Sequence, residues 1–454
     1  MPTMLTEEQL QEKWSPVIDY AKFNPIDNSA KKADLSLMLE NTEEMGRGGR
    51  TLTETVSALP ANYMGASSST AGSGGIDTYD PIMVSMIRRN VPNLISYDIC
   101  GTQVMTGPTG LIFAARSRYT SQTGPENFYN EVNTAFSSVT TGANTFGQAF
   151  TGSFPGNSNT TPLTSVNTYN TGTGTTLAIG ETIGTDGGPA FPQMALSIEK
   201  VQVTALTRKL KAEWTREIAQ DMKAIHGLDM KQEMINLLST EMVAEINREI
   251  LRTVNLTAVA GATGGAGAQT TATAGVFDLD TDSNGRWMGE KFQGMIFQIE
   301  MEANAIAKNT RRGRGNIMIV SSNVASALNM AGKLTYAPSV NSNNLQIDDT
   351  GNTYAGVLSN NIKVYIDPYV MGGDYFTVGF KGADRLDAGL FYCPYVPLQL
   401  MQAIDQGTFD PKIGFQTRYG IVANPFAGGL VDNRGALLFG SNQYYRRVVV
   451  NNIA

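Results

Sequence analysis

Histidine is almost absent from this chain: His226 is the only one among 454 residues. A single histidine excludes zinc sites built on a pair of histidines, and it leaves any Ser-His or Cys-His mechanism dependent on this one residue. The sequence predicts that a helix ends at Gly227, and the dipole of that helix accounts for a histidine at its C-terminus. We therefore do not expect His226 to be catalytic.

Cysteine is also scarce. Cys100 and Cys393 are the only two, and they lie far apart without the spacing of a metal or redox motif. This pattern favours two buried free thiols over a disulfide.

Long apolar runs are missing as well. No run approaches the roughly 20 residues that a membrane-spanning helix needs, and residues 1–10 lack the basic and apolar regions of a secretion signal. We therefore expect a cytoplasmic product. With 41% hydrophobic and 17% charged residues, the composition is that of a folded protein of about two to four domains.

An excess of positive charge is absent too. The net charge is −7, and residues 1–54 alone hold ten acidic and six basic residues, which leaves −3 for the rest. Affinity for phosphates comes mainly from excess Lys and Arg, so this balance argues against a dedicated nucleic-acid binder. The densest basic cluster, residues 311–315, is interpreted as a helix end and turn.

Motifs for cofactors and metals are incomplete. The glycine-rich residues 261–267 are followed by no Lys-Ser or Lys-Thr pair, so a loop is predicted. Residues 280–285 match the first half of a calcium loop, but Lys291 stands where that motif needs glutamate. A plain turn is favoured there, and we predict no catalytic residue, no cofactor and no bound metal.

Two other kinds of function stay open at this point. A hydrolase would need Asp278, Asp280 and Asp282 to gather in a pocket that perturbs a carboxylate. A monomeric binding module would use the region rich in Thr, Ser and Gly at residues 119–188.

The first 75 residues hold the most informative pattern. Thr6 and Gln9 can cap a short helix that Pro16 is expected to end, and residues 29–45 form an amphipathic helix with Leu35, Met38 and Leu39 on one face. The tripeptide Leu52-Thr53-Glu54 follows, and residues 66–75 have the composition of a flexible linker. This order is typical of a removable segment, although an ordinary helical hairpin on a linker has the same pattern.

The remaining chain is predicted to mix helices and strands. Residues 107–110 separate two short β-like runs, as in a hairpin or an extended loop. Asp229 is expected to cap a long helix whose buried stripe includes Ile235, Met242 and Ile250. Further helices are expected at 289–309 and 323–330. Strands are expected within 198–214 and at 316–320, 362–366, 375–380, 389–392, 413–420 and 444–450.

Several runs resemble a known family. Residues 86–101 are similar to the start of the mature major capsid protein of T-even-like tailed bacteriophages. The similarity continues in order at 217–221, 224–227, 245–249, 275–278, 354–358, 365–367, 374–379, 417–420 and 424–426. It spans most of residues 1–25 and 50–454, and it departs from the family at 119–193, where an insertion domain is shortened and low in complexity.

The resemblance implies an α+β, Hong Kong 97 phage-type capsid fold. It also implies that residues 1–54 are an acidic helical assembly propeptide, 55–100 an N-terminal arm, and 101–197 an extended loop with a shortened insertion. Residues 198–285 and 360–454 would form a peripheral domain with a spine helix at about 229–254. Residues 286–359 would form an axial domain.

The function implied by the resemblance is that of a major shell subunit, and not of an enzyme. Its subunits form hexameric capsomers of an icosahedral prohead, assembled in the host cytoplasm, which expands to enclose packaged double-stranded DNA. The expected partners are copies of itself, a vertex protein, a scaffold core, a prohead protease, a portal and decoration proteins, with non-specific DNA contact and no membrane. A vertex subunit of the same phage type is the alternative.

Processing is also implied by the resemblance. The family's protease cuts after a hydrophobic-x-Glu motif, which Leu52-Thr53-Glu54 matches. The predicted cut lies between Glu54 and Thr55.

Overall fold

The structure is a computed structural model that describes most of the chain. The described residues are 7–19, 29–54, 94–127, 132–134, 136–138, 174–186, 188–262, 271–283, 287–336, 353–358, 361–370, 372–405, 407–427 and 435–453, and for residues 7, 17, 42–54, 138, 335, 336 and 353 only the backbone is described. The chain divides into two compact units: Met1–Leu111 with Gln202–Asn309 and Gly313–Ala454, and Ile112–Val201 with Thr310–Arg312.

An eight-stranded sheet holds the main core of the first unit. Its order is β5-β14-β11-β7-β10-β9-β8, with β6 paired to β14. The bounds are β5 Ala258–Ala260, β6 Val276–Asp278, β7 Ile317–Ser321, β8 Leu334–Tyr336, β9 Thr353–Leu358, β10 Ile362–Asp367, β11 Asp374–Gly379 and β14 Asn442–Asn451. Every residue of β7 is buried, as expected for a central strand with both faces covered.

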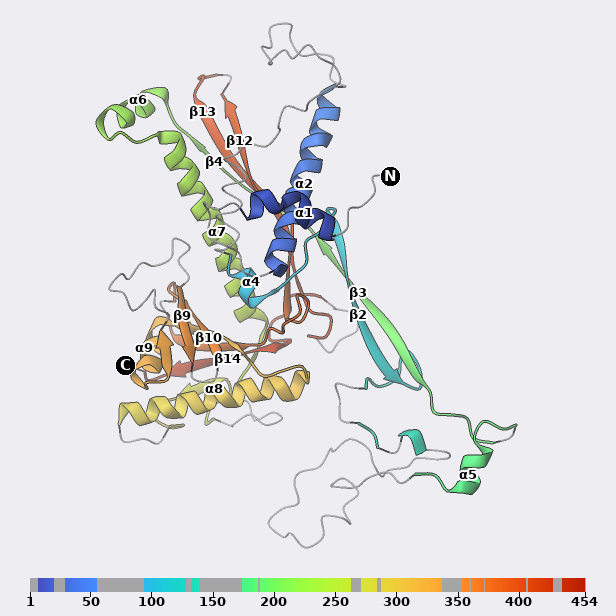
Figure 1. Ribbon diagram of the computed structural model, residues 1–454. Coiled ribbons are helices and arrows are strands. Elements are labelled where there is room, and N and C mark those ends of the chain that lie inside the picture. The colour runs from blue at the N-terminus through green and yellow to red at the C-terminus, as the bar shows by residue number, and fades with distance from the viewer. Residues whose placement is uncertain are drawn as a thin grey trace. The chain divides into compact units, whose positions relative to one another are not determined.

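Two helices pack against this sheet (Figure 1). They are α8 Met288–Thr310, which runs along the sheet, and the shorter α9 Ser322–Met330. Met295, Ile299 and Ile306 of α8 lie in the same buried cluster as β7. Arg311 follows α8 with a φ of 55°, so the basic cluster does mark a helix end, as predicted.

A four-stranded sheet and a long helix form the rest of this unit. The sheet order is β1-β12-β13-β4, with β1 Gly101–Thr102, β4 Leu206–Glu213, β12 Leu390–Ile404 and β13 Pro411–Ala423. Gly101 is required in β1 because a Cβ there would lie 2.6 Å from the Arg385 carbonyl oxygen. Both β12 and β13 are longer than the strands predicted at 389–392 and 413–420.

The predicted spine helix is α7, Met230–Thr257, which the Asp229 carboxylate caps by accepting from the Lys231 N–H at 3.0 Å. The whole predicted stripe is buried: Ile235, Leu238, Met242, Ile246 and Ile250. Before it, α6 Arg216–Ile225 is capped by Thr215 and ends at His226. Gly227 follows with a φ of 68°, which favours glycine and confirms the predicted stop.

The second unit is built on a two-stranded sheet of β2 Thr109–Tyr119 and β3 Met194–Thr204, which we call the β2–β3 hairpin although a long insertion separates its strands. Of the two interpretations of residues 107–110, the hairpin between neighbouring runs is wrong, because β1 pairs with β12 while β2 pairs with β3. The other interpretation, an extended loop, stays a prediction. Two short helices, η2 Phe136–Ser138 and α5 Leu177–Thr182, are described in the insertion.

The N-terminal head consists of α1 Glu7–Ile18 and α2 Ser29–Glu54, and α4 Ser96–Ile99 follows. Pro16 lies inside α1, so the prediction that it ends this helix is wrong. Trp14 and Ile18 on either side of it are buried at 6% and 2% exposure, and that packing holds the last turn despite the missing N–H. Thr6 and the linker at 66–75 lie outside the described residues.

These elements confirm the predicted α+β class. The division into domains stays a prediction, and the boundary expected at residues 359 and 360 falls inside the eight-stranded sheet. Strands β7, β8 and β9 precede that boundary, whereas β10, β11 and β14 follow it. None of the described helices combines the length and apolarity needed to cross a membrane.

The two cysteines are buried free thiols, as predicted. Burial raises the pKa of Cys100 and of Cys393 to about 12. Because the thiolate is the reactive form, we expect neither to react with iodoacetamide at pH 8 in the folded chain, and both to react after unfolding in guanidinium. Intact-mass measurement checks this, and a labelled thiol in the folded chain would contradict it.

Candidate assembly surfaces

The residues considered for chemistry do not form a catalytic site. His226 is exposed at the end of α6. Asp278 accepts from the Asp280 N–H at 2.9 Å and from Asn452 at 2.8 Å, and these hydrogen bonds lower its pKa. A hydrolase would need a carboxylate in a perturbing pocket, and Asp278 is instead stabilised in its charged form by donors at the surface.

The predicted turn at 280–283 is also supported by its contacts. Asp282 accepts from the N–H groups of Ala272 and Asp278, each at 2.9 Å, and Lys291 pairs with Asp280. Lys291 therefore stands where a calcium loop needs a glutamate ligand, and its ammonium group pairs with Asp280. Within the described ranges, no group of three acidic, histidine or cysteine side chains could hold a metal ion.

One face of the β2–β3 hairpin exposes large apolar side chains. We call it the hairpin face, and it consists of Phe113, Met194, Leu196 and Ile198, with exposures of 61%, 55%, 59% and 69%. Side chains alternate between faces along a strand, so these residues share a side of the two-stranded sheet. Contiguous apolar surface of this kind marks a site of interaction.

The opposite face of the hairpin holds an ion cluster. Glu199 is 5% exposed and lies 3.3 Å from Arg116 Nε and 3.1 Å from Arg118 Nη2. Arg118 also donates to the Gly124 carbonyl at 2.8 Å. This bonding ties the two strands together, which an isolated hairpin needs because two strands alone are marginally stable.

Further apolar side chains are exposed at the ends of other elements. Ile225 at the end of α6 is 75% exposed, and Ile404 and Phe409 at the β12–β13 turn are 63% and 65% exposed. Trp287, just before α8, is 74% exposed. These positions lie apart in the chain, so the molecule presents apolar surface at several elements.

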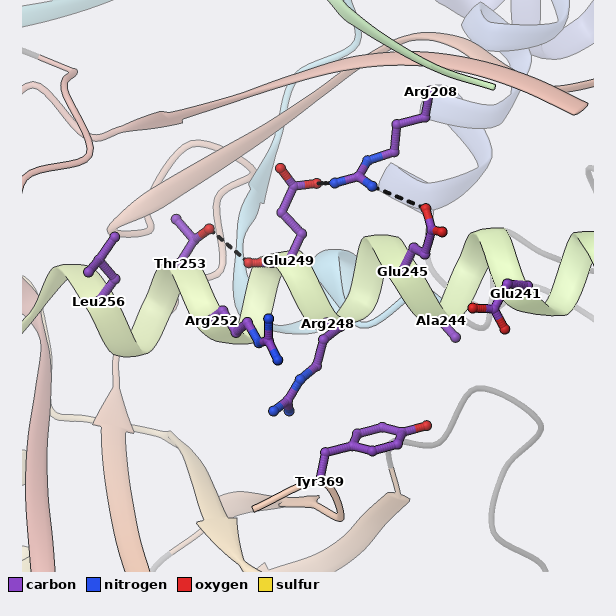
Figure 2. A pocket seen from close by; sticks show the side chains of 10 residues that line it. All are labelled: Arg208, Glu241, Ala244, Glu245, Arg248, Glu249, Arg252, Thr253, Leu256 and Tyr369. Carbon is purple, nitrogen blue, oxygen red and sulfur yellow. Dashed lines mark hydrogen bonds and ion pairs between the residues drawn. The ribbon is translucent and has the colours of Figure 1, made fainter. Parts of the chain in front are cut away.

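A hollow of about 760 Å³ lies along α7 and is lined by charged side chains (Figure 2). Arg208 Nη1 is 3.1 Å from Glu245 and its Nη2 is 2.7 Å from Glu249, while its Nε donates to Tyr419 Oη at 2.6 Å. These contacts tie β4 and β13 to the spine helix. Because these charges are paired with one another, we interpret the contacts as structural.

A second contact braces the same helix. Arg248 Nη1 pairs with the buried Asp367 at the end of β10 at 2.5 Å, and its guanidinium lies 5.1 Å from the centre of the Tyr369 ring. Asp367 also accepts from Tyr375 Oη at 2.8 Å. The spine helix is therefore joined to the eight-stranded sheet as well.

The head packs on the body of its own chain. The predicted stripe of Leu35, Met38 and Leu39 is buried at 0–2% exposure, in one cluster with Leu94 and Ile99. Two polar residues lie among them. Asp34 is 1% exposed and Asn41 is 6% exposed, and both contact the body.

The predicted processing site lies at the end of the head. The backbone of Leu52, Thr53 and Glu54 forms the last residues of α2. Thr55 lies outside the described residues, and the cut between Glu54 and Thr55 stays a prediction.

Sequence reasoning missed the polar contacts of the head. Asp34, Met38 and Asn41 are three or four residues apart, so both polar residues fall on the apolar face of the helix. Such an interruption of an amphipathic stripe was the available signal. The partners of these residues lie far along the chain and had no signal of their own.

Comparisons with known proteins agree with the predicted family. The family model described as "Major capsid protein Gp23" matches residues 76–450. The major capsid protein of Serratia phage KSP90 is 37% identical over 439 residues, 94% of this chain and 92% of the relative. That of Enterobacteria phage T4 is 33% identical over 528 residues, 99% of this chain and 100% of the relative.

Two other likenesses are more limited. The capsid vertex protein of Enterobacteria phage T4 is 29% identical over 254 residues, 50% of this chain and 52% of the relative. A solved chain of Mycobacterium phage Bobi matches 89% of this chain and 98% of its own length at 9% identity, with a TM-score of 0.39. At that score the structural likeness adds nothing to the assignment.

The full-length relatives are structural proteins of phage capsids, which confirms that this chain is a virion component and not an enzyme. The exposed apolar surfaces agree with that role. Because the family match covers most of the chain and relatives at 33% and 37% identity span nearly all of it, the chain belongs to the Gp23 major capsid protein family of tailed phages.

Proposed function

We propose that this chain is the subunit of hexameric capsomers in an icosahedral, Hong Kong 97 phage-type head that encloses double-stranded DNA. The family match over residues 76–450 carries the proposal. The hairpin face supports it, because four exposed apolar side chains on one hairpin need a partner to cover them. In a closed shell, symmetry supplies that partner at every position.

The alternative is a vertex subunit, which would form pentamers. Coverage favours the major subunit, since the vertex relative matches 50% of this chain and the major capsid relatives 94% and 99%. Electron microscopy of capsomers from the expressed chain tests the choice. Class averages with six-fold symmetry support the proposal, whereas five-fold averages alone would favour the vertex subunit.

The parts of the subunit are proposed to follow the sheets. The axial part would contain the eight-stranded sheet with α8 and α9, and the peripheral part α6, α7 and the four-stranded sheet. The extended loop would contain the β2–β3 hairpin with its shortened insertion. This division moves β5, β6, β10, β11 and β14 from the predicted peripheral domain to the axial one.

The head is proposed to act as an assembly propeptide. Heads would bind a scaffold core or one another inside the prohead in the host cytoplasm, and a prohead protease would cut between Glu54 and Thr55. The acidic character of the head, with −4 of the net charge of −7, supports a separate role for it. Loss of the head would then permit expansion of the lattice with new burial between subunits.

Substitution of the residue before the cut tests this processing step. In Glu54→Ala particles we expect full-length subunits and an unexpanded shell, because the glutamate of the motif is gone. Glu44→Ala is the matched control, since Glu44 has no hydrophobic residue two positions before it. Intact mass and particle diameter are measured together, and mature-sized Glu54→Ala shells with shortened subunits would place the cut elsewhere.

The remaining partners are proposed from the family. A vertex protein, a portal and decoration proteins would complete the shell, and contact with DNA would be non-specific. The charge of −3 outside the head supports weak contact with packaged DNA, because tight binding would need excess basic residues.

A further inference from the structure

Residues 31–41 of α2 pack on a surface of the body that we call the seat, which is formed by residues of α4, β1 and β12 and of the segments next to them. Asp34 pairs with Arg385, and Thr102 Oγ1 donates to the same carboxylate at 2.9 Å. The Thr102 N–H in turn donates to the Arg385 carbonyl oxygen at 3.1 Å. Strand β1 and the turn before β12 therefore present the two donors side by side.

A second polar contact with the seat is made by Asn41, seven residues after Asp34. Asn41 Nδ2 donates to the carbonyl oxygens of Met105 and Tyr395, at 2.9 and 3.2 Å. Lys31, at the other end, is 3.3 Å from Asp98 of α4. The contacts cover residues 31–41, and the residues that receive them all lie after the predicted cut.

The apolar contacts make this attachment strong. Leu35, Met38 and Leu39 are buried almost completely, and full burial of each such side chain is worth about a tenfold to hundredfold change in affinity. The peptide bond after Glu54 lies 13 residues beyond Asn41. Breaking that bond removes none of the contacts in the seat.

Buried polar atoms without a hydrogen bond lie close in sequence to the residues that contact the head. Ser96 Oγ, Tyr97 Oη and Gln103 Oε1 are buried without a hydrogen-bond partner among the described residues. Asp34 itself is a buried charge whose stability depends on Arg385. Loss of one polar partner in such an interface leaves a buried group unpaired and therefore weakens the attachment.

From these contacts we propose that residues 31–41 act as a latch, bound in cis, that keeps the head on the body after cleavage. The proposal rests on the processing function proposed above. Release of the head requires the Asp34–Arg385 pair to break, which movement of the turn carrying Arg385 would achieve. The seat then becomes exposed when the head is released, and not when the chain is cut.

The test uses the full chain with a recognition sequence for a site-specific endoprotease inserted between residues 66 and 75. After cutting, the fraction of head fragment that stays with the body is followed by sedimentation and mass spectrometry. In the wild-type sequence we expect the fragment to remain bound. In Asp34→Asn we expect it to dissociate roughly 30-fold faster or more, since one partner of a buried charge pair is neutralised.

Two further variants sharpen the test. Asp19→Asn is the matched control, because Asp19 pairs at 2.8 Å with Lys32 of the head itself, and its fragment should be retained as in the wild type. The double variant Asp34→Asn with Arg385→Gln removes both charges and should retain the fragment better than Asp34→Asn alone. Circular dichroism of the uncut chains establishes that each variant is folded.

Immediate loss of the wild-type fragment on cutting would overturn the proposal, as would equal retention in Asp34→Asn and Asp19→Asn. The inserted site does not depend on Glu54. A wrong processing site would therefore show in the Glu54→Ala particles, while a wrong latch would show only here.

Discussion

Phe113→Asp combined with Ile198→Asp is expected to leave a folded chain that no longer assembles. Both side chains lie on the hairpin face at 61% and 69% exposure, so aspartate at either position meets solvent in the isolated subunit. In the shell, the same positions would place two charges in an apolar contact. Truncating one anchor residue of an interface commonly costs about 2 kcal/mol or more, which is about 30-fold in affinity.

The effect on assembly should exceed that of a single contact, because every subunit of a closed shell repeats the defect. Particle yield is measured by sedimentation and electron microscopy, and folding by circular dichroism. Gln193→Asp is the control, since Gln193 is exposed beside β3 and the change adds a charge without removing apolar surface. Particles at wild-type yield in the double variant would exclude the hairpin face from the assembly contacts.

Glu302→Ala is expected to cause the largest loss of folding stability. Glu302 is 0% exposed, pairs with Arg446 of β14, and accepts from the Ala262 N–H and from Gln298 Nε2, each at 2.7 Å. The alanine would leave the Arg446 guanidinium buried without its partner at 4% exposure. Removing one member of a buried pair costs about 3–5 kcal/mol of unfolding free energy.

Glu300→Ala provides a control on the same helix. Glu300 pairs with Arg314, whose side chain is 39% exposed, so its loss should cost no more than about 1 kcal/mol. Denaturant unfolding followed by circular dichroism compares the two variants. Similar midpoints for Glu302→Ala and Glu300→Ala would show that the buried pair does not hold α8 to β14.

Periodic elements of this fold were predictable from the sequence. The buried stripe of α7 and the stop at Gly227 follow from local rules, since apolar spacing and glycine geometry act within a few residues. Pro16 was predicted wrongly because burial of Trp14 and Ile18, a tertiary effect, outweighs the local cost of proline. The pairing of β1 with β12 was not predictable, because register between distant strands leaves no local pattern.

The assembly surfaces were predictable only through the family resemblance. Phe113 and Ile198 belong to strands with ordinary alternation, and the sequence does not say which face stays uncovered. The contact of Asp34 with Arg385 was even harder to predict, since the two residues lie 351 positions apart in the chain. An isolated acidic residue on an apolar helix face was the only local sign of it.

The proposed function requires that this polypeptide associates with copies of itself. Light scattering of the natively purified chain over a range of concentrations tests it most directly. We expect species of capsomer mass or larger, whose average mass rises with concentration. A stable species of 48.8 kDa, the mass of one chain, at every concentration would contradict it.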